Sequence, residues 1–155
     1  MRRALAFGLV FAQFVLLAAL VFVPHGTVWP VNGLIVAATV VLGATGVLLA
    51  GLGLVGLGPA LTASPIPREN APFVTGGVYG LVRNPIYTGL IAGGAGLVLL
   101  GASVWHIVAW VLLVLLLSSK TRWEERMLLA EHPEFAEYAR RVGRFLPGIG
   151  RLRKR

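Results

Sequence analysis

The first of two segments whose side chains could bind a charged small molecule centres on Arg83. Asn84 and Pro85 follow Arg83 directly. Tyr79 lies four residues before Arg83, and Tyr87 lies four residues after it. Proline favours the first position of a helix, and the free N–H groups there, together with a guanidinium, suit a carboxylate or a phosphate. The same residues could instead be an aromatic belt with a snorkelling arginine at a membrane surface.

The second segment holds two adjacent carboxylates, Glu124 and Glu125. Lys120 precedes Glu124 by four residues, so the two can attract each other on one face of a helix. A solvated charged face is the ordinary interpretation. Adjacent carboxylates so close to a long apolar stretch are less usual, and they would suit a cationic ligand.

Several other kinds of site are not expected. The chain has no cysteine, which excludes disulfides, thiolate nucleophiles and cysteine-ligated metals. A glycine pattern at Gly51, Gly53 and Gly56 resembles a dinucleotide fingerprint, but it ends an apolar run with no strand before it. The three histidines are scattered along the chain, so we expect no metal site.

The elements that must position the two segments are membrane helices. Hydrophobic residues make up 57% of the 155 positions and charged residues only 13%, against about 25% in soluble domains. Positions 4–67 and 84–119 contain no Asp, Glu, Lys or Arg. We attribute the net charge of +8 to anionic lipid headgroups and expect no nucleic-acid partner.

We therefore predict an all-α integral membrane bundle of four transmembrane helices with a short helical C-terminal cytosolic cap. The first apolar stretch is longer than the core of a cleaved signal peptide, so we expect it to be retained. A tight hairpin at Gly101, Ala102 and Ser103 would separate the last two spans. The single domain, 1–155, then has spans near 5–23, 31–57, 86–101 and 104–119, a loop over 58–85 and a cap over 120–155.

The distribution of basic residues predicts the orientation. With four spans, all 14 Lys and Arg residues fall on one side of the membrane, whereas three spans would divide them. The positive-inside rule then places both termini and the 58–85 loop in the cytosol.

Small residues and a periodic pattern predict two packing contacts. The spacings Gly46-x-x-x-Ala50 and Gly89-x-x-x-Gly93 are typical of closely packed helices in lipid. In the cap, apolar residues at i, i+3, i+4 and i+7 predict a short amphipathic helix over 133–142.

Five motifs together resemble the isoprenylcysteine carboxyl methyltransferase family, a membrane group related to phospholipid N-methyltransferases. They extend over roughly residues 58–150 in the order of that family. The motifs are Phe73-Val74-Thr75-Gly76-Gly77-Val78-Tyr79, Arg83-Asn84-Pro85-Ile86-Tyr87-Thr88-Gly89, Glu124-Glu125-x-x-Leu128, Pro133-Glu134-Phe135-x-x-Tyr138-x-x-Arg141-Val142 and Phe145-Leu146-Pro147.

The resemblance implies a membrane enzyme that holds S-adenosylmethionine in a cytosol-facing pocket, with a lipid-like acceptor entering from the bilayer. The C-terminal segment would cover the pocket. The chain departs from the family in having Asn84 where histidine is common, and in being about one residue short between Leu128 and Tyr138. An amide can donate a hydrogen bond but cannot carry a proton, which puts any acid–base role at position 84 in doubt.

By the resemblance, Arg83 and Arg141 would orient an anionic acceptor, and Glu124 would act both in catalysis and, with Glu125, on the ribose or amino group of the cofactor. Bringing the methyl donor into line and excluding water would be the protein's main tasks. The other expected cofactor-binding residues are Tyr79, Asn84, Tyr87, Leu146 and Pro147.

The expected function is S-adenosylmethionine-dependent methyl transfer to a lipid-like or small amphiphilic acceptor, with a carboxylate favoured. A carboxylate needs no general base, whereas an amine must lose a proton and no histidine is well placed to take it. The alternatives are a phospholipid or amine N-methyltransferase, an NADPH-dependent membrane reductase on a related core, and a non-catalytic membrane scaffold. The oligomeric state stays open.

Overall fold

The computed structural model describes residues 2–60 and 73–152. Parts of the predicted 58–85 loop and of the cap, positions 61–72 and 153–155, lie outside the described residues. The described residues form helices and no strand beyond one isolated bridge. The helices are α1 (Arg2–Phe22), α2 (Gly33–Leu57), α3 (Pro85–Gly101), α4 (Val104–Glu131) and α5 (Phe135–Arg141), with the short 3-10 turns η1 (Gly58–Ala60) and η2 (Gly77–Gly80).

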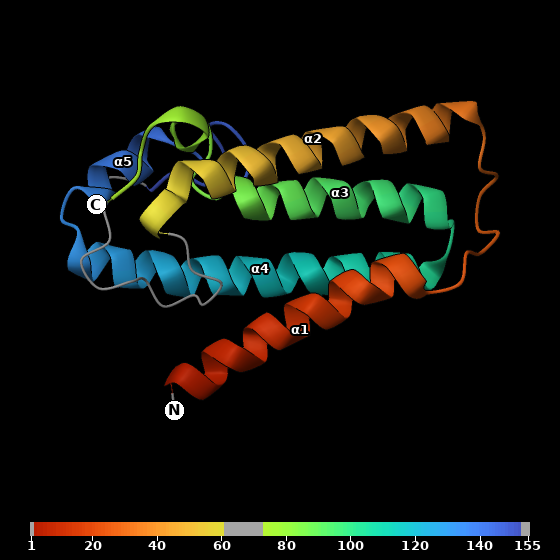
Figure 1. The fold of residues 1–155 in the computed structure, drawn as a ribbon, viewed down its shortest axis with the longest axis horizontal. Coiled ribbons are helices and arrows are strands. Elements are labelled where there is room, and N and C mark those ends of the chain that lie inside the picture. Colours follow the sequence, from red (N-terminus) through yellow and green to blue (C-terminus); the bar gives the residue numbers. More distant parts are fainter. Residues whose placement is uncertain (1, 61–72, 153–155) are drawn as a thin grey trace.

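Helices α1 to α4 run alternately in opposite directions (Figure 1). One end of the bundle carries the N-terminus, the end of α2, the start of α3 and helix α5, and we call it the cap end. The other end, the turn end, carries the α1–α2 loop and the α3–α4 turn. The predicted all-α membrane bundle is confirmed.

Three of these helices are long and apolar enough to cross a membrane: α1 from Ala4, α2, and α4. Helix α3 is apolar and shorter, with 17 residues, or roughly 25 Å at about 1.5 Å per residue. The chain is thus a multi-pass membrane protein. Helix α4 continues without a break beyond the predicted span 104–119, so one 28-residue helix carries both membrane and cap residues.

The predicted hairpin between α3 and α4 is confirmed at the turn end. Helix α3 ends at Gly101, Ala102 adopts the left-handed conformation with φ 44°, and the Ser103 side chain accepts a hydrogen bond from the Trp105 amide at 3.3 Å. The α1–α2 loop is tied to this turn because the Gly26 amide donates to the Gly101 carbonyl at 2.8 Å.

Helices α2 and α3 pack closely through the predicted glycines. A Cβ atom on Gly89 would lie 2.5 Å from the Gly46 carbonyl oxygen and 2.9 Å from the Ala50 nitrogen. The Thr39 hydroxyl donates to the Gly96 carbonyl at 3.1 Å across the same interface. Such backbone contact is how helices associate in lipid, where hydrophobicity no longer drives them together.

The cap consists of α5 and the segment after it, and it forms its own small core. Phe135, Tyr138 and Ala139 of α5 are buried, and the Phe73 ring packs against the first two, with ring centroids 5.8 Å and 5.5 Å away. The predicted cap helix is therefore confirmed, although it begins at Phe135 rather than at 133. Its buried face brings the segment that follows it over the start of α3.

Candidate active site

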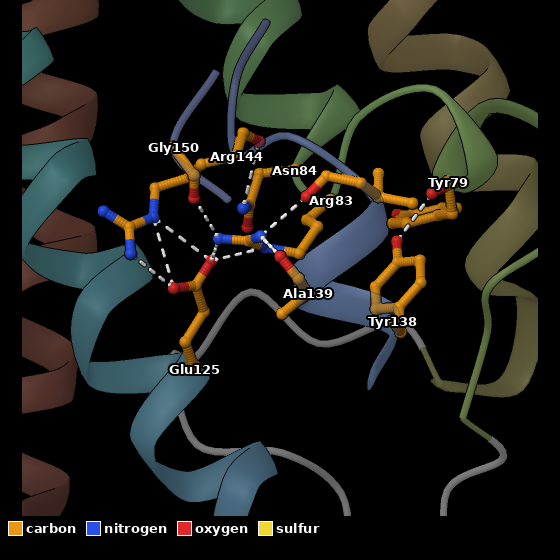
Figure 2. Close-up of polar contacts among 9 residues, drawn as sticks. Tyr79, Arg83, Asn84, Glu125, Tyr138, Ala139, Arg144 and Gly150 are labelled. Atoms are coloured by element: carbon orange, nitrogen blue, oxygen red, sulfur yellow. Dashed lines mark hydrogen bonds and ion pairs between the residues drawn. The ribbon is translucent and has the colours of Figure 1, made fainter. Parts of the chain in front are cut away.

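The guanidinium of Arg83 lies at the centre of the cap end, and each of its three nitrogens has a protein partner (Figure 2). Nε and Nη2 lie 3.0 Å and 2.9 Å from Oε1 of Glu125. Nη1 donates to the carbonyls of Ala139 at 2.8 Å and Val142 at 2.7 Å, and Nη2 donates to that of Gly150 at 3.0 Å. Arg83 therefore joins α4, α5 and the segment after α5, residues 142–152.

Glu125 is shared between two arginines, as Figure 2 shows. Arg144 donates from Nη2 to Oε2 at 2.6 Å and from Nε to both carboxylate oxygens at 3.2 Å. The Glu125 side chain is only 8% exposed. Two guanidinium groups supply the charge and the donors that a buried carboxylate requires.

Backbone hydrogen bonds hold the C-terminal segment, residues 142–152, against the start of α3. The Arg83 amide donates to the Gly143 carbonyl at 2.8 Å, and the Asn84 amide donates to the Arg144 carbonyl at 3.2 Å. The Asn84 side chain reaches the same Arg144 carbonyl at 3.3 Å. Gly143 is required here, because a Cβ atom would overlap the Leu146 carbonyl oxygen.

Glu124 faces a different partner from its neighbour in sequence. Its Oε1 accepts a hydrogen bond of 2.7 Å from the Tyr87 hydroxyl of α3. Successive residues of a helix point about 100° apart, which lets Glu124 meet α3 while Glu125 meets the C-terminal segment. Within the described residues this is the one side-chain hydrogen bond of Glu124, so the second carboxylate oxygen can accept from a ligand.

Two buried tyrosines connect the cap to α2. The Tyr138 hydroxyl donates to the Tyr79 carbonyl at 2.6 Å, and the Tyr79 hydroxyl donates to the Gly53 carbonyl at 3.1 Å. Burial raises the pKa of Tyr138 to about 12 and also raises the pKa of Tyr79 above its ordinary value. Both hydroxyls therefore stay protonated at neutral pH and act as hydrogen-bond donors.

The structure places most of the predicted site residues at the cap end, where each has a hydrogen-bond partner. These are Tyr79, Arg83, Asn84, Tyr87, Glu124 and Glu125. Three others lie on the outside. The Arg141 side chain is 72% exposed, with Glu137 3.8 Å away, and Leu146 and Pro147 are also exposed. The chemical roles predicted for all nine residues stay predictions.

Two residues at the cap end were not predicted as site residues from the sequence. Arg144 was not considered at all, and Lys120 was considered only as a neighbour of Glu124. Arg144 lies directly before the Phe145-Leu146-Pro147 motif, but nothing in its type or spacing marked it as the partner of Glu125. Lys120 is 2% exposed, although its charge suggested a solvated helix face. The available signal was that Lys120 continues the apolar spacing of Leu113 and Leu117 on α4.

The residues at this end fit the polar groups of S-adenosylmethionine. The second carboxylate oxygen of Glu124 suits the ribose hydroxyls or the amino group. At the start of α3, Pro85 has no N–H and the Asn84 amide donates to the Arg144 carbonyl, so the N–H groups of Ile86 and Tyr87 are those that suit a carboxylate. Among residues 2–60 and 73–152, no three metal-ligating side chains cluster together.

Comparison with known proteins assigns the family. Residues 34–132 match the phospholipid methyltransferase family. The chain is 36% identical over 88 residues to the cobalt-zinc-cadmium resistance protein CzcN of Cupriavidus metallidurans, covering 56% of this chain and 40% of that one. It is 32% identical over 90 residues to the nickel-cobalt-cadmium resistance protein NccN of Alcaligenes xylosoxydans xylosoxydans, covering 56% and 41%.

The chain thus spans about two fifths of the length of these curated relatives. No solved structure matches it. The family match covers more than half of the chain, begins in α2 and includes all of α3 and α4, which carry Tyr87, Glu124 and Glu125. The protein belongs to the phospholipid methyltransferase family, whose members are membrane methyltransferases related to the isoprenylcysteine carboxyl methyltransferases.

Proposed function

We propose that the protein transfers a methyl group from S-adenosylmethionine to a lipid-like or small amphiphilic acceptor at the cytosolic face of a membrane. One observation carries the proposal: the Tyr87–Glu124 pair lies beside the Arg83–Glu125–Arg144 cluster, at the end of the bundle that gathers the basic residues. Membership of a methyltransferase family supports it. By the positive-inside rule, the cap end faces the cytosol.

Each group at the cap end has a distinct task in this proposal. When bound, S-adenosylmethionine supplies an electrophilic methyl group on a positively charged sulfur. Glu124, held by Tyr87, binds the ribose or the amino group of the cofactor, while Asn84 and the first amides of α3 bind its carboxylate. Arg83 and Glu125 hold the C-terminal segment over the site, which excludes water and aligns the reacting groups.

A carboxylate is the first candidate for the acceptor, because its oxygen attacks without prior loss of a proton. Every Arg83 nitrogen has a protein partner, whereas Arg144 donates from Nε and Nη2 and makes no hydrogen bond from Nη1 among the described residues. In the proposal Arg144 therefore takes over the orienting of an anionic acceptor that the sequence suggested for Arg83. Arg141 is exposed on α5 with Glu137 3.8 Å away, so the proposal gives it no part.

A phospholipid amine is the second candidate, and the description of the family favours it. An amine must lose a proton before it attacks. In this proposal the Glu124 carboxylate accepts it, because Glu125 is already held by two arginines. Glu124 would then act on the acceptor as well as on the cofactor.

Cofactor binding is the first test. We expect the purified protein in detergent to bind S-adenosylhomocysteine in calorimetry, and Glu124→Gln to weaken that affinity at least tenfold, about 1.4 kcal/mol. Glu131→Gln is the matched control, because Glu131 is an exposed carboxylate on the same helix. Wild-type affinity in Glu124→Gln would remove the assigned role, and no binding at millimolar ligand would refute the proposal and favour a membrane scaffold.

A labelled-methyl assay separates the two acceptors. The protein in lipid nanodiscs is supplied with methyl-labelled S-adenosylmethionine and either an amphiphilic carboxylate or phosphatidylethanolamine. Alkali releases label from a methyl ester as methanol, whereas an N-methyl group resists it. Alkali-labile product supports the carboxylate, and alkali-stable product replaces it with the amine.

A further inference from the structure

Lys120 of α4 is buried where the pattern of the helix calls for an apolar side chain. The buried residues Ala109, Leu113 and Leu117 follow one another at helical spacing along the core-facing side of α4, and Lys120 is next. Its side chain is 2% exposed. Burying an amine in an apolar bundle is costly, so a lysine kept there needs a specific partner and indicates a specific task.

One partner of Lys120 comes from the first helix. Nζ of Lys120 donates to Oε1 of Gln13 at 2.9 Å, although the two residues are 107 positions apart. Gln13 is itself buried, with 9% exposure, and is the one polar side chain between positions 4 and 23. A polar side chain isolated in the first apolar stretch therefore meets the first charged residue of α4 inside the bundle.

Lys120 also contacts the candidate site. Nζ lies 5.0 Å from the centroid of the Tyr87 ring, a distance at which a cation is attracted to the face of an aromatic ring. The hydroxyl of that ring binds Glu124 at 2.7 Å. Gln13, Lys120, Tyr87 and Glu124 thus form one continuous series of contacts that runs from α1 to the cap end.

We propose that Lys120, held by Gln13, is a positioning residue that fixes the Tyr87 ring and thereby the Glu124 carboxylate in the geometry that binds the methyl donor. This inference rests on the proposed function. It assigns a part in the site to α1, which lies outside the residues matched to the family. The first span is then a component of the site and not only a membrane anchor.

A purely structural role would make the pair a polar link between α1 and α4. Replacing both partners by apolar residues tells the two roles apart, because an apolar pair of similar size is often neutral or stabilising in a buried position. Lys120→Met with Gln13→Leu should therefore keep the thermal midpoint within a few degrees of wild type. Its affinity for S-adenosylhomocysteine should nevertheless fall about tenfold, within the range expected for losing a desolvated cation–π contact.

Conservative and matched variants complete the test. Lys120→Arg keeps a cation for the ring and should retain most of the affinity, whereas Arg122→Met removes an exposed charge from the same helical turn and should change nothing. In a Tyr87→Phe background, which lacks the hydroxyl that reaches Glu124, Lys120→Met should cause little further loss. Full additivity of the two losses would contradict a role exercised through Tyr87.

The outcomes separate the two proposals. Wild-type affinity in the folded Lys120→Met, Gln13→Leu protein overturns the positioning role and leaves the proposed function standing. If that protein does not fold, Gln13→Met alone decides, since unchanged affinity there excludes any contribution from α1. Failure of the wild-type protein itself to bind S-adenosylhomocysteine overturns both.

Discussion

Glu125 and Glu124 show how differently two neighbouring residues of one type can be used. Glu125 is surrounded by the guanidinium groups of Arg83 and Arg144 and joins parts of the fold. Glu124 meets a tyrosine hydroxyl and can still accept a hydrogen bond from a ligand. The first carboxylate should therefore matter mainly for stability, and the second for binding.

Glu125→Gln removes the charge between the buried Arg83 and the partly exposed Arg144 while keeping the shape of the side chain. We expect a loss of about 3 kcal/mol in stability, the usual effect of leaving a buried ion pair unbalanced. The measurements are the thermal midpoint in detergent and the rate of tryptic cleavage after Arg144. Glu137→Gln is the control. Glu137 pairs with Arg141, both side chains are 72% exposed, and losing such a pair should lower the stability by no more than about 0.5 kcal/mol.

Because of Tyr138, we predict that the folded protein loses stability in alkali. Its pKa is about 12 in the folded protein, against an ordinary value of 10.0, so the folded state holds this proton more tightly. The resulting stability is fully present below pH 10 and is lost as the pH rises toward 12. Thermal midpoints measured from pH 8 to 12 should fall over this range, and the fall should be smaller in Tyr138→Phe. An equal fall in both proteins would exclude this hydroxyl as a cause.

At the scale of the elements, the closest contact in the bundle is that between α2 and α3. It depends on backbone meeting backbone at Gly46 and Gly89, because every alternative residue would add a Cβ atom where there is no room. The contact fixes the start of α3, and with it Tyr87, relative to α2. Helix α4 is uninterrupted, so Glu124 and Lys120 belong to the same helix as its membrane-spanning residues.

Gly89→Ala should disrupt this interface. The added Cβ atom would lie 2.5 Å from the Gly46 carbonyl oxygen, so the helices must separate, at about 1–3 kcal/mol of stability. Gly93→Ala lies one turn further along α3, where a Cβ atom meets nothing within 4 Å. It should be neutral or slightly stabilising, because alanine favours a helix over glycine. Equal thermal midpoints for the two variants would refute the packing explanation.

At the scale of the whole molecule, the alternation of four apolar helices brings the start of α1, the start of α3 and helix α5 to the cap end (Figure 1), and the basic residues of the described chain lie on these segments, on the second half of α4 and after α5. Much of the charge that we expect to orient the protein in the membrane therefore lies at the same end as the residues of the candidate site. In consequence, the membrane face that receives the positive charge is the face where the chemistry is proposed.

Cysteine labelling tests this orientation, and the absence of native cysteine leaves no background. Thr75→Cys, just before the turn η2, and Arg151→Cys, in the C-terminal segment, should react with a membrane-impermeant maleimide only after cells are opened. Thr27→Cys in the α1–α2 loop should react in intact cells. The reverse pattern would place the site on the outer face.

Much of the fold was predictable because it follows from local properties of the chain. Long uncharged stretches defined the spans, and Gly101, Ala102 and Ser103 marked the hairpin. The spacing of Gly46 and Ala50, and of Gly89 and Gly93, predicted the α2–α3 contact. The predicted last span ended at 119 because charged residues begin at Lys120, whereas α4 continues as one helix to Glu131.

The sequence by itself determined that this is a four-helix membrane protein and which short segments carry its polar residues, since hydropathy and spacing act along the chain. Only the tertiary structure decided the partners. Arg83 and Glu125 are 42 positions apart, and Lys120 and Gln13 are 107 apart. Each buried charge must find its donors and acceptors in space, so its neighbours depend on how the helices pack and not on its place in the sequence.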